Sequence, residues 1–209
     1  MTPVGEMPRK EHGDYRVGWI CTLSQEQTAA IGMLDMIHEG LPKPYRDSNT
    51  YQLGSIGGHN VVIACLPKGK PGSTSANTVA GNMMRTFTGI RYFLLVGTGS
   101  GIPPKVRLGD VVVSVPTGTF PGVVQWDAGK AERGGVFRRT GALNNPPSVL
   151  LGAVSRMESG HELEGSRIPD HVEDLARKFP RLASGYLRSD ALRDLLFKAS
   201  YPHRSRRGQ

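Results

Sequence analysis

The chain has 209 residues, and its 26 Lys and Arg against 18 Asp and Glu give a formal net charge of +8. This length predicts one domain, or one domain and a fragment. No apolar run approaches the roughly 18 residues of a membrane span, and residues 1–14 lack the apolar stretch of a secretory signal. These features argue against a secreted, membrane-spanning or collagen-like protein.

The positive charge is concentrated at the end of the chain. Residues 177–209 hold nine Lys and Arg and two Asp, which is typical of a solvated terminus. Nucleic acid is not expected as a partner, because no aromatic residue follows Tyr201 to stack on bases. Cys21 and Cys65 both lie in apolar runs, which indicates buried thiols, a reducing compartment and a cytoplasmic location.

The hydrophobic pattern alternates between strand-like and helical segments. A strand is predicted over 15–23, followed by a helix that opens at Ser24, with Gln27 completing a capping box. Strands over 50–56 and 60–66 are joined by Gly57-Gly58, a hairpin signal. The remaining predictions are a helix at 76–87, strands at 91–96 and 111–115, a loop over 116–147, and helices at 148–158, 169–179 and 189–200. Near-continuous apolar strands indicate an α/β sheet that is covered on both faces.

A glycine-rich turn, Gly97-Thr98-Gly99-Ser100-Gly101, follows the strand at 91–96. Backbone N–H groups at the carboxyl end of such a strand can bind a ligand. An equally weighted alternative is a tight turn that needs positive φ at glycine. The motif is not a dinucleotide fingerprint, because Pro103-Pro104 prevents a helix from starting after it. The six histidines show no metal-ligand spacing, and neither a metal nor a cofactor is expected.

Glu26 and Asp110 are the carboxylates that the pattern singles out. At the second position of a helix, the charge of Glu26 is favoured by the helix dipole, and this structural role needs no function. The turn after the first strand is also where such sheets bind ligands, so Glu26 is a candidate general base. Asp110, in Leu108-Gly109-Asp110, is predicted to bond backbone N–H groups at a turn.

Several blocks resemble one known family in the same order. They are 17–26 (VGWICTLSQE), 49–51, 57–67, the 97–101 loop, 107–114 (RLGDVVVS) and 122–130 (GVVQWDAGK). They resemble the purine/uridine (nucleoside) phosphorylase superfamily, and most of all the methylthioadenosine/adenosylhomocysteine nucleosidase-like N-terminal domains of fungal NLR-like and ankyrin-repeat proteins. The resemblance covers about residues 15–202. It implies a domain over 15–202, while composition and charge predict a flexible lead-in over 1–14 and a basic tail over 203–209.

The resemblance implies a three-layer α/β/α fold with a central mixed sheet, and action on the N-glycosidic bond of purine nucleosides. Glu26 matches the glutamate that activates water in the nucleosidases. Thr98, with Gly97 and Gly99, matches the loop that contacts the nucleophile or ribose. Trp126 lies in a loop that borders the base pocket in relatives, although core packing is an equal alternative. Leu95 stands where phosphorylases place a phosphate-binding arginine, so hydrolysis is favoured over phosphorolysis.

The chain also departs from the family. The segments that clamp the ribose hydroxyls and protonate the leaving purine have no match here, so the fold is expected to be incomplete at its C-terminus and activity weak or absent. The alternative function is a non-catalytic nucleoside-sensing or interaction module of a signalling protein. The expected partner is a small-molecule nucleoside, with no membrane. A homo-oligomer is left open, since members of the family are often oligomers.

Overall fold

The computed structural model describes residues 10–187, 193–198 and 200–201, and residues 1–9 and 203–209 of the predicted lead-in and tail lie outside this part. The chain divides into two compact units, one formed by residues 1–100 and 173–187 and the other by residues 101–172 and 188–209. Each unit is described by itself.

A five-stranded mixed sheet forms the centre of the first unit, in the order β2-β3-β4-β1-β5. Its strands are β1 (Val17–Cys21), β2 (Met36–His38), β3 (Tyr51–Ile56), β4 (His59–Cys65) and β5 (Tyr92–Leu95). β1 runs parallel to both β4 and β5, whereas β2, β3 and β4 are antiparallel. The carboxyl ends of β1, β4 and β5 therefore meet at one edge of the sheet. The strands predicted at 15–23, 50–56, 60–66 and 91–96 are confirmed, and β2 is an additional strand too short to stand out in the sequence.

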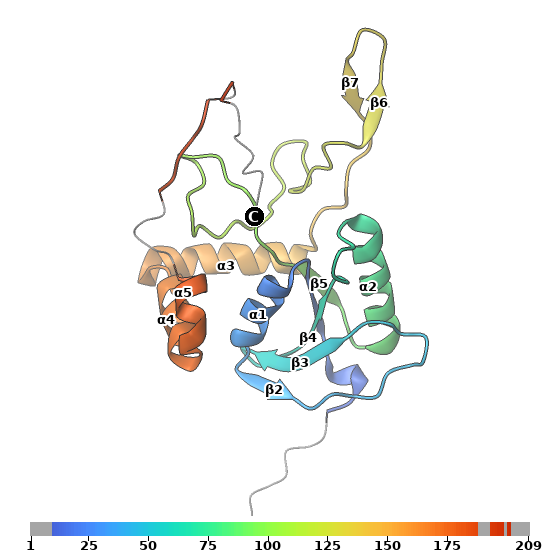
Figure 1. The fold of residues 1–209 in the computed structure, drawn as a ribbon, viewed down its shortest axis with the longest axis vertical. Coiled ribbons are helices and arrows are strands. Elements are labelled where there is room, and N and C mark those ends of the chain that lie inside the picture. Colours follow the sequence, from blue (N-terminus) through green and yellow to red (C-terminus); the bar gives the residue numbers. More distant parts are fainter. Residues whose placement is uncertain (1–9, 188–192, 199, 202–209) are drawn as a thin grey trace, which may run out of the picture. The chain divides into compact units, whose positions relative to one another are not determined.

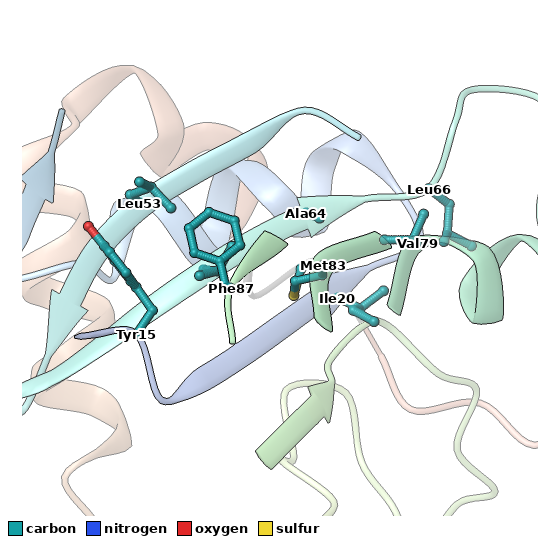
Figure 2. Packing of buried hydrophobic residues seen from close by; sticks show 9 residues of the cluster. Tyr15, Ile20, Leu53, Ala64, Leu66, Val79, Met83 and Phe87 are labelled. Carbon is teal, nitrogen blue, oxygen red and sulfur yellow. The ribbon is translucent and has the colours of Figure 1, made fainter. Parts of the chain in front are cut away.

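Helices cover both faces of this sheet (Figure 1). Helix α2 (Ser73–Thr86) packs on the face that carries Val62 and Ala64 of β4, through Val79, Met83 and the adjoining Phe87 (Figure 2). Helix α1 (Ser24–Gly32) packs on the face that carries Val61 and Ile63. Alternate residues of β4 thus point into two separate cores, which is why the strand reads as a continuous apolar run.

The first unit is therefore a mixed α/β fold with a three-layer α/β/α arrangement, as predicted. Tyr15 and Phe87 are among its largest fully buried side chains, with ring centroids 5.5 Å apart at a near-perpendicular angle. Edge-to-face contacts of this kind stabilise aromatic pairs by about 0.5–1.5 kcal/mol beyond the area that they bury. Tyr15 also hydrogen-bonds Nδ1 of His38 over 2.9 Å, which ties the residues before β1 to β2.

The remaining elements follow β5 in the chain. They are β6 (Gly129–Ala131), β7 (Phe137–Arg139), α3 (Ser148–Glu164), α4 (Ile168–Lys178), η2 (Pro180–Leu182) and α5 (Ala183–Tyr186), and a short η1 (His12–Asp14) precedes β1. β6 and β7 form an antiparallel hairpin inside the segment that was predicted to be a loop. Its two strands have three residues each, too few for their alternation to be distinguished in a glycine-rich stretch.

The strand predicted at 111–115 does not form. Valine favours strands because its side chain packs against neighbouring strands of a sheet. Residues 111–115 pair with no other strand in the described part of the chain. Their side chains are consequently exposed, with 66% for Val111 and 71% for Val112. The turn before them is formed as predicted, because Asp110 Oδ2 accepts the Arg107 N–H over 2.9 Å.

Two helix boundaries differ markedly from the prediction, and one predicted helix does not form where it is described. α2 begins at Ser73, three residues before the predicted start, and α3 continues to Glu164. The helix predicted at 189–200 is absent from residues 193–198, the longest described run of that segment, and residues 188–192 and 199 lie outside the described residues. Helices this short depend on packing against an apolar face, and Leu195 and Leu196 are 62% and 65% exposed.

Candidate functional site

Glu26 lies at the edge of the sheet where the parallel strands β1, β4 and β5 end. Leu23 is the N-cap of α1, so Ser24 is the first helical residue and Glu26 the third, not the second as predicted. The predicted pairing of Ser24 with Gln27 is wrong for the same reason. The carboxylate of Glu26 instead satisfies the free N–H groups before the helix, accepting those of Thr22 at 2.7 Å and Leu23 at 2.9 Å on Oε2.

The other carboxylate oxygen reaches the end of the neighbouring strand β5. Oε1 of Glu26 accepts the backbone N–H of Thr98 at 2.8 Å and the Thr98 hydroxyl at 3.1 Å. One side chain therefore links the turn after β1 to the turn after β5. The structure thus brings together Glu26 and Thr98, two of the residues that the sequence singled out.

Gly97 is required by this contact. A Cβ atom at position 97 would lie 2.6 Å from Oε1 of Glu26, closer than real Cβ contacts allow. Its φ is not positive, nor is that of Gly99 or Gly101, so the alternative of a tight turn with left-handed glycines is wrong. The glycine at 97 provides space for the carboxylate, whereas Gly99 has open space around it.

The environment of Glu26 favours its charged form. Burial by itself raises the pKa of a carboxyl group, but the hydrogen bonds from Thr98, Leu23 and Thr22 outweigh burial and hold the pKa of Glu26 below its usual value. Glu26 is thus a carboxylate at neutral pH, the form that a general base needs. The same hydrogen bonds make Glu26 a weaker base, because donors that stabilise the charged carboxylate oppose its protonation.

Two thiols lie beneath this carboxylate. Cys21 and Cys65 are register partners at the ends of β1 and β4 and are both free. Burial raises the pKa of Cys21 to about 12, helped by the nearby Cys65 and Glu26, and burial with Glu26 also raises the pKa of Cys65. The thiolate is the reactive form of cysteine, so these side chains act as neutral packing groups. The prediction of buried thiols is confirmed for Cys21, whereas Cys65 is half-buried.

The connections around the site leave the sheet in opposite directions. The chain passes from β1 to α1 on one face and from the adjacent parallel strand β4 to α2 on the other (Figure 1). Such a topological switch point is where open α/β sheets bind ligands, outside the carboxyl ends of the strands. The position of Glu26 next to this point is the main geometric reason to regard it as a functional residue.

Trp126 lies in the second unit, with its side chain 81% exposed. The alternative of core packing for this tryptophan is therefore wrong, while its predicted contact with a base stays a prediction. A hollow of about 200 Å³ in the same unit is lined by residues that include Phe120, Gln125 and Leu143, but not by Trp126 itself. Arg139 lies over the Phe120 ring at 5.2 Å from its centroid.

A buried polar network in the first unit had no counterpart in the sequence predictions. The Asp47 carboxylate accepts hydrogen bonds from Asn49 N–H at 2.9 Å, from the Tyr51 hydroxyl at 2.8 Å and from the Thr86 hydroxyl at 2.5 Å. The Asn49 side chain donates to the Val79 carbonyl at 2.8 Å. The bonds to Thr86 and Val79 fasten the loop before β3 to α2, and the other two lie within this loop and the start of β3, so the network is structural. The alternating Asp-x-Asn-x-Tyr spacing before a strand is the signal that could have indicated it.

Within the residues that the structure describes, no group of three or more His, Cys, Asp or Glu side chains could hold a metal ion. None of the helices in that part has both the length and the apolar composition that crossing a bilayer would require.

Comparison with known proteins relates the chain to one class. Over 165 residues it is 48% identical to a nucleotide-binding leucine-rich repeat (NLR)-like protein of Hyaloscypha variabilis, an alignment that covers 77% of this chain and 16% of that protein. The chain is related to fungal NLR-like proteins. It spans less than a fifth of the length of this NLR-like relative. No protein-family model matches the chain, and no solved structure matches it.

Proposed function

We propose that this domain hydrolyses the N-glycosidic bond of a purine nucleoside, with Glu26 as the base that activates water. The observation that supports this most is the carboxylate held by backbone N–H groups at the switch point of the sheet. Three of its donors belong to the main chain, so its position is set by the fold. A base that is fixed in place and unprotonated at neutral pH meets the first requirements of general base catalysis.

In the proposed reaction, a water molecule attacks the anomeric carbon of the ribose while Glu26 takes one of its protons. The bond from water oxygen to carbon forms, the bond to the base nitrogen breaks, and the base leaves with the electron pair and takes its proton from solvent. The oxocarbenium-like character of such transition states would be favoured by the negative charge of Glu26 nearby.

Hydrolysis is preferred over phosphorolysis because of the charges around Glu26. All groups that bind the carboxylate are neutral N–H or hydroxyl donors. Leu95, at the end of β5, is 71% exposed, and by resemblance it matches the position where nucleoside phosphorylases hold phosphate with arginine. A phosphate dianion needs cationic or bidentate partners, which a leucine cannot supply, whereas water needs a base.

The test measures the release of free base from adenosine, inosine and uridine, with and without phosphate. Chromatography detects the released base. Weak phosphate-independent release is expected, with a loss of about 10²-fold or more in Glu26→Gln, the lower bound of general base contributions. Glu39→Gln is the matched control, because Glu39 is an exposed glutamate after β2 in the same unit. Release that requires phosphate, or that survives Glu26→Gln, would contradict the proposal.

A second candidate function is a nucleoside-sensing module without catalysis, as part of a signalling protein. The similarity to a much longer NLR-like protein favours it, since the aligned segment is 16% of that protein. The two functions differ in one measurement on folded protein. A sensor binds adenosine or inosine in equilibrium dialysis and releases no free purine. Its binding does not require residue 26 to accept a proton.

A further inference from the structure

The carboxylate of Glu26 has no free acceptor position in this structure. A carboxylate offers about four lone-pair sites on its two oxygens. Oε2 receives the N–H groups of Thr22 and Leu23, and Oε1 receives the N–H and the hydroxyl of Thr98. A water molecule or ligand hydroxyl that is to be bound or deprotonated by Glu26 must first replace one of these donors.

Only one of the donors can leave without moving the backbone. The N–H groups of Thr22 and Leu23 belong to the turn between β1 and α1, and that of Thr98 follows directly on β5. The Thr98 hydroxyl, by contrast, turns away by rotation about χ1, between staggered rotamers. Its bond, at 3.1 Å, is also the longest of the four, and Thr98 is exposed to solvent.

We propose that the Thr98 hydroxyl is a removable cap on Oε1 of Glu26, and that a nucleoside binds by displacing it. We call this group the cap hydroxyl. The proposal rests on the proposed function, in that it concerns regulation of the same carboxylate. Thr98 is thereby a positioning residue, which acts on the ligand through Glu26. In the capped state the acceptor positions of the carboxylate are filled by the four donors, and it becomes a base only when a ligand hydroxyl or the attacking water takes the place of the cap hydroxyl.

The hydrogen bond from the cap hydroxyl affects the titration of Glu26. Cys21 on β1 and Cys65 on β4 interact with the charge of Glu26, and both are thiols that stay neutral near pH 7. The Thr98 side chain is itself among the hydrogen bonds that lower the pKa of Glu26. Removal of the cap hydroxyl therefore moves the midpoint of Glu26 titration to higher pH.

The test compares Thr98→Val with Thr98→Ser in the full chain. Valine keeps the shape and the backbone N–H but removes the hydroxyl, whereas serine keeps the hydroxyl. Binding of adenosine, inosine and uridine is measured by equilibrium dialysis. We expect Thr98→Val to bind a nucleoside more tightly, by up to roughly tenfold, because displacing a hydrogen bond to a charged group is no longer required. Thr98→Ser should match the wild type.

The direction in which nucleoside affinity changes in Thr98→Val distinguishes a removable cap from other roles of Thr98. A threonine that contacts the ligand directly, or that merely supports the fold, predicts weaker or unchanged binding in Thr98→Val, and either result overturns the proposal. Absence of nucleoside binding by both wild type and Thr98→Val overturns it as well. A carbon-13 NMR titration of the Glu26 carboxyl adds a second readout, with a midpoint that rises in Thr98→Val and not in Thr98→Ser.

Failure of the cap and failure of the proposed function give different results. If binding tightens and the midpoint rises in Thr98→Val but no variant releases base, the cap stands and hydrolysis is wrong. The rate of base release is also measured as a function of pH. If base is released and the rate falls at the same acidic pH in wild type and Thr98→Val, hydrolysis stands and the cap is wrong.

Discussion

A single carboxylate fastens two neighbouring strand ends in this protein. Glu26 accepts backbone N–H groups from the turn after β1 and from the turn after β5. Its position in the chain, just after an apolar strand and inside the first turn of a helix, could be predicted from sequence. Its partner Thr98, 72 residues away, was suggested by family resemblance and was joined to it only by the structure.

Gly97 is the residue on which this junction depends. In Gly97→Ala the new Cβ would lie 2.6 Å from Oε1 of Glu26, so the carboxylate must move and lose its hydrogen bonds to Thr98. We expect a loss of about 1–3 kcal/mol in the free energy of unfolding, as for other overpacked sites, measured by urea denaturation. Gly99→Ala is the control, because its Cβ meets nothing within 4 Å and its φ is not positive. Equal stabilities of the two variants would contradict the assigned role of Gly97.

At the scale of elements, the hairpin of β3 and β4 is where local chemistry and structure agree best. The two strands pair antiparallel up to Ile56 and His59, with Gly57 at φ 54° and Gly58 at φ 80° between them. Positive φ at both central residues is the type I′ pattern that Gly-Gly predicts. A two-residue loop sets the register of its strands by itself, which explains why the prediction needed no tertiary information.

The two loop glycines of this hairpin should respond differently to substitution. Asn is favoured at the first central position of a type I′ turn, so Gly57→Asn should change the unfolding free energy by less than about 0.5 kcal/mol. Gly58→Val should destabilise the protein by about 1–2 kcal/mol, since left-handed backbone strains an L-residue. Neither added Cβ meets an atom within 4 Å, so crowding does not contribute. Urea denaturation of both variants checks this, and a Gly58→Val variant as stable as Gly57→Asn would refute it.

At the scale of the whole molecule, the two compact units differ in how much they bury. The first contains the two apolar clusters on the faces of the sheet. Residues 101–172, all of which are described, include no fully buried side chain. Hydrophobic burial is the main favourable term in folding, so these residues should open at a lower free energy than the sheet.

Limited proteolysis with trypsin tests this difference on two exposed arginines. Arg133 lies between β6 and β7, whereas Arg85 lies in α2, between the buried residues Met83 and Thr86. We expect cleavage after Arg133 to be at least roughly tenfold faster, because a protease needs local opening and opening follows local burial. Mass spectrometry of the first fragments measures both sites. Simultaneous cleavage at the two arginines would show that the units unfold together.

The sequence by itself determined the local features of this protein. Apolar runs predicted β1, β3, β4 and β5, a Gly-Gly pair predicted the hairpin, and Asp110 predicted its own turn, because each depends on residues close together in the chain. Tertiary structure decided what depends on partners. The segment 111–115 has the composition of a strand but pairs with no other strand in the described residues, and Gly97 looks like a turn glycine until Glu26 is placed against it. Pairing and close approach join residues far apart in the chain, and single-sequence patterns do not record which segments will meet.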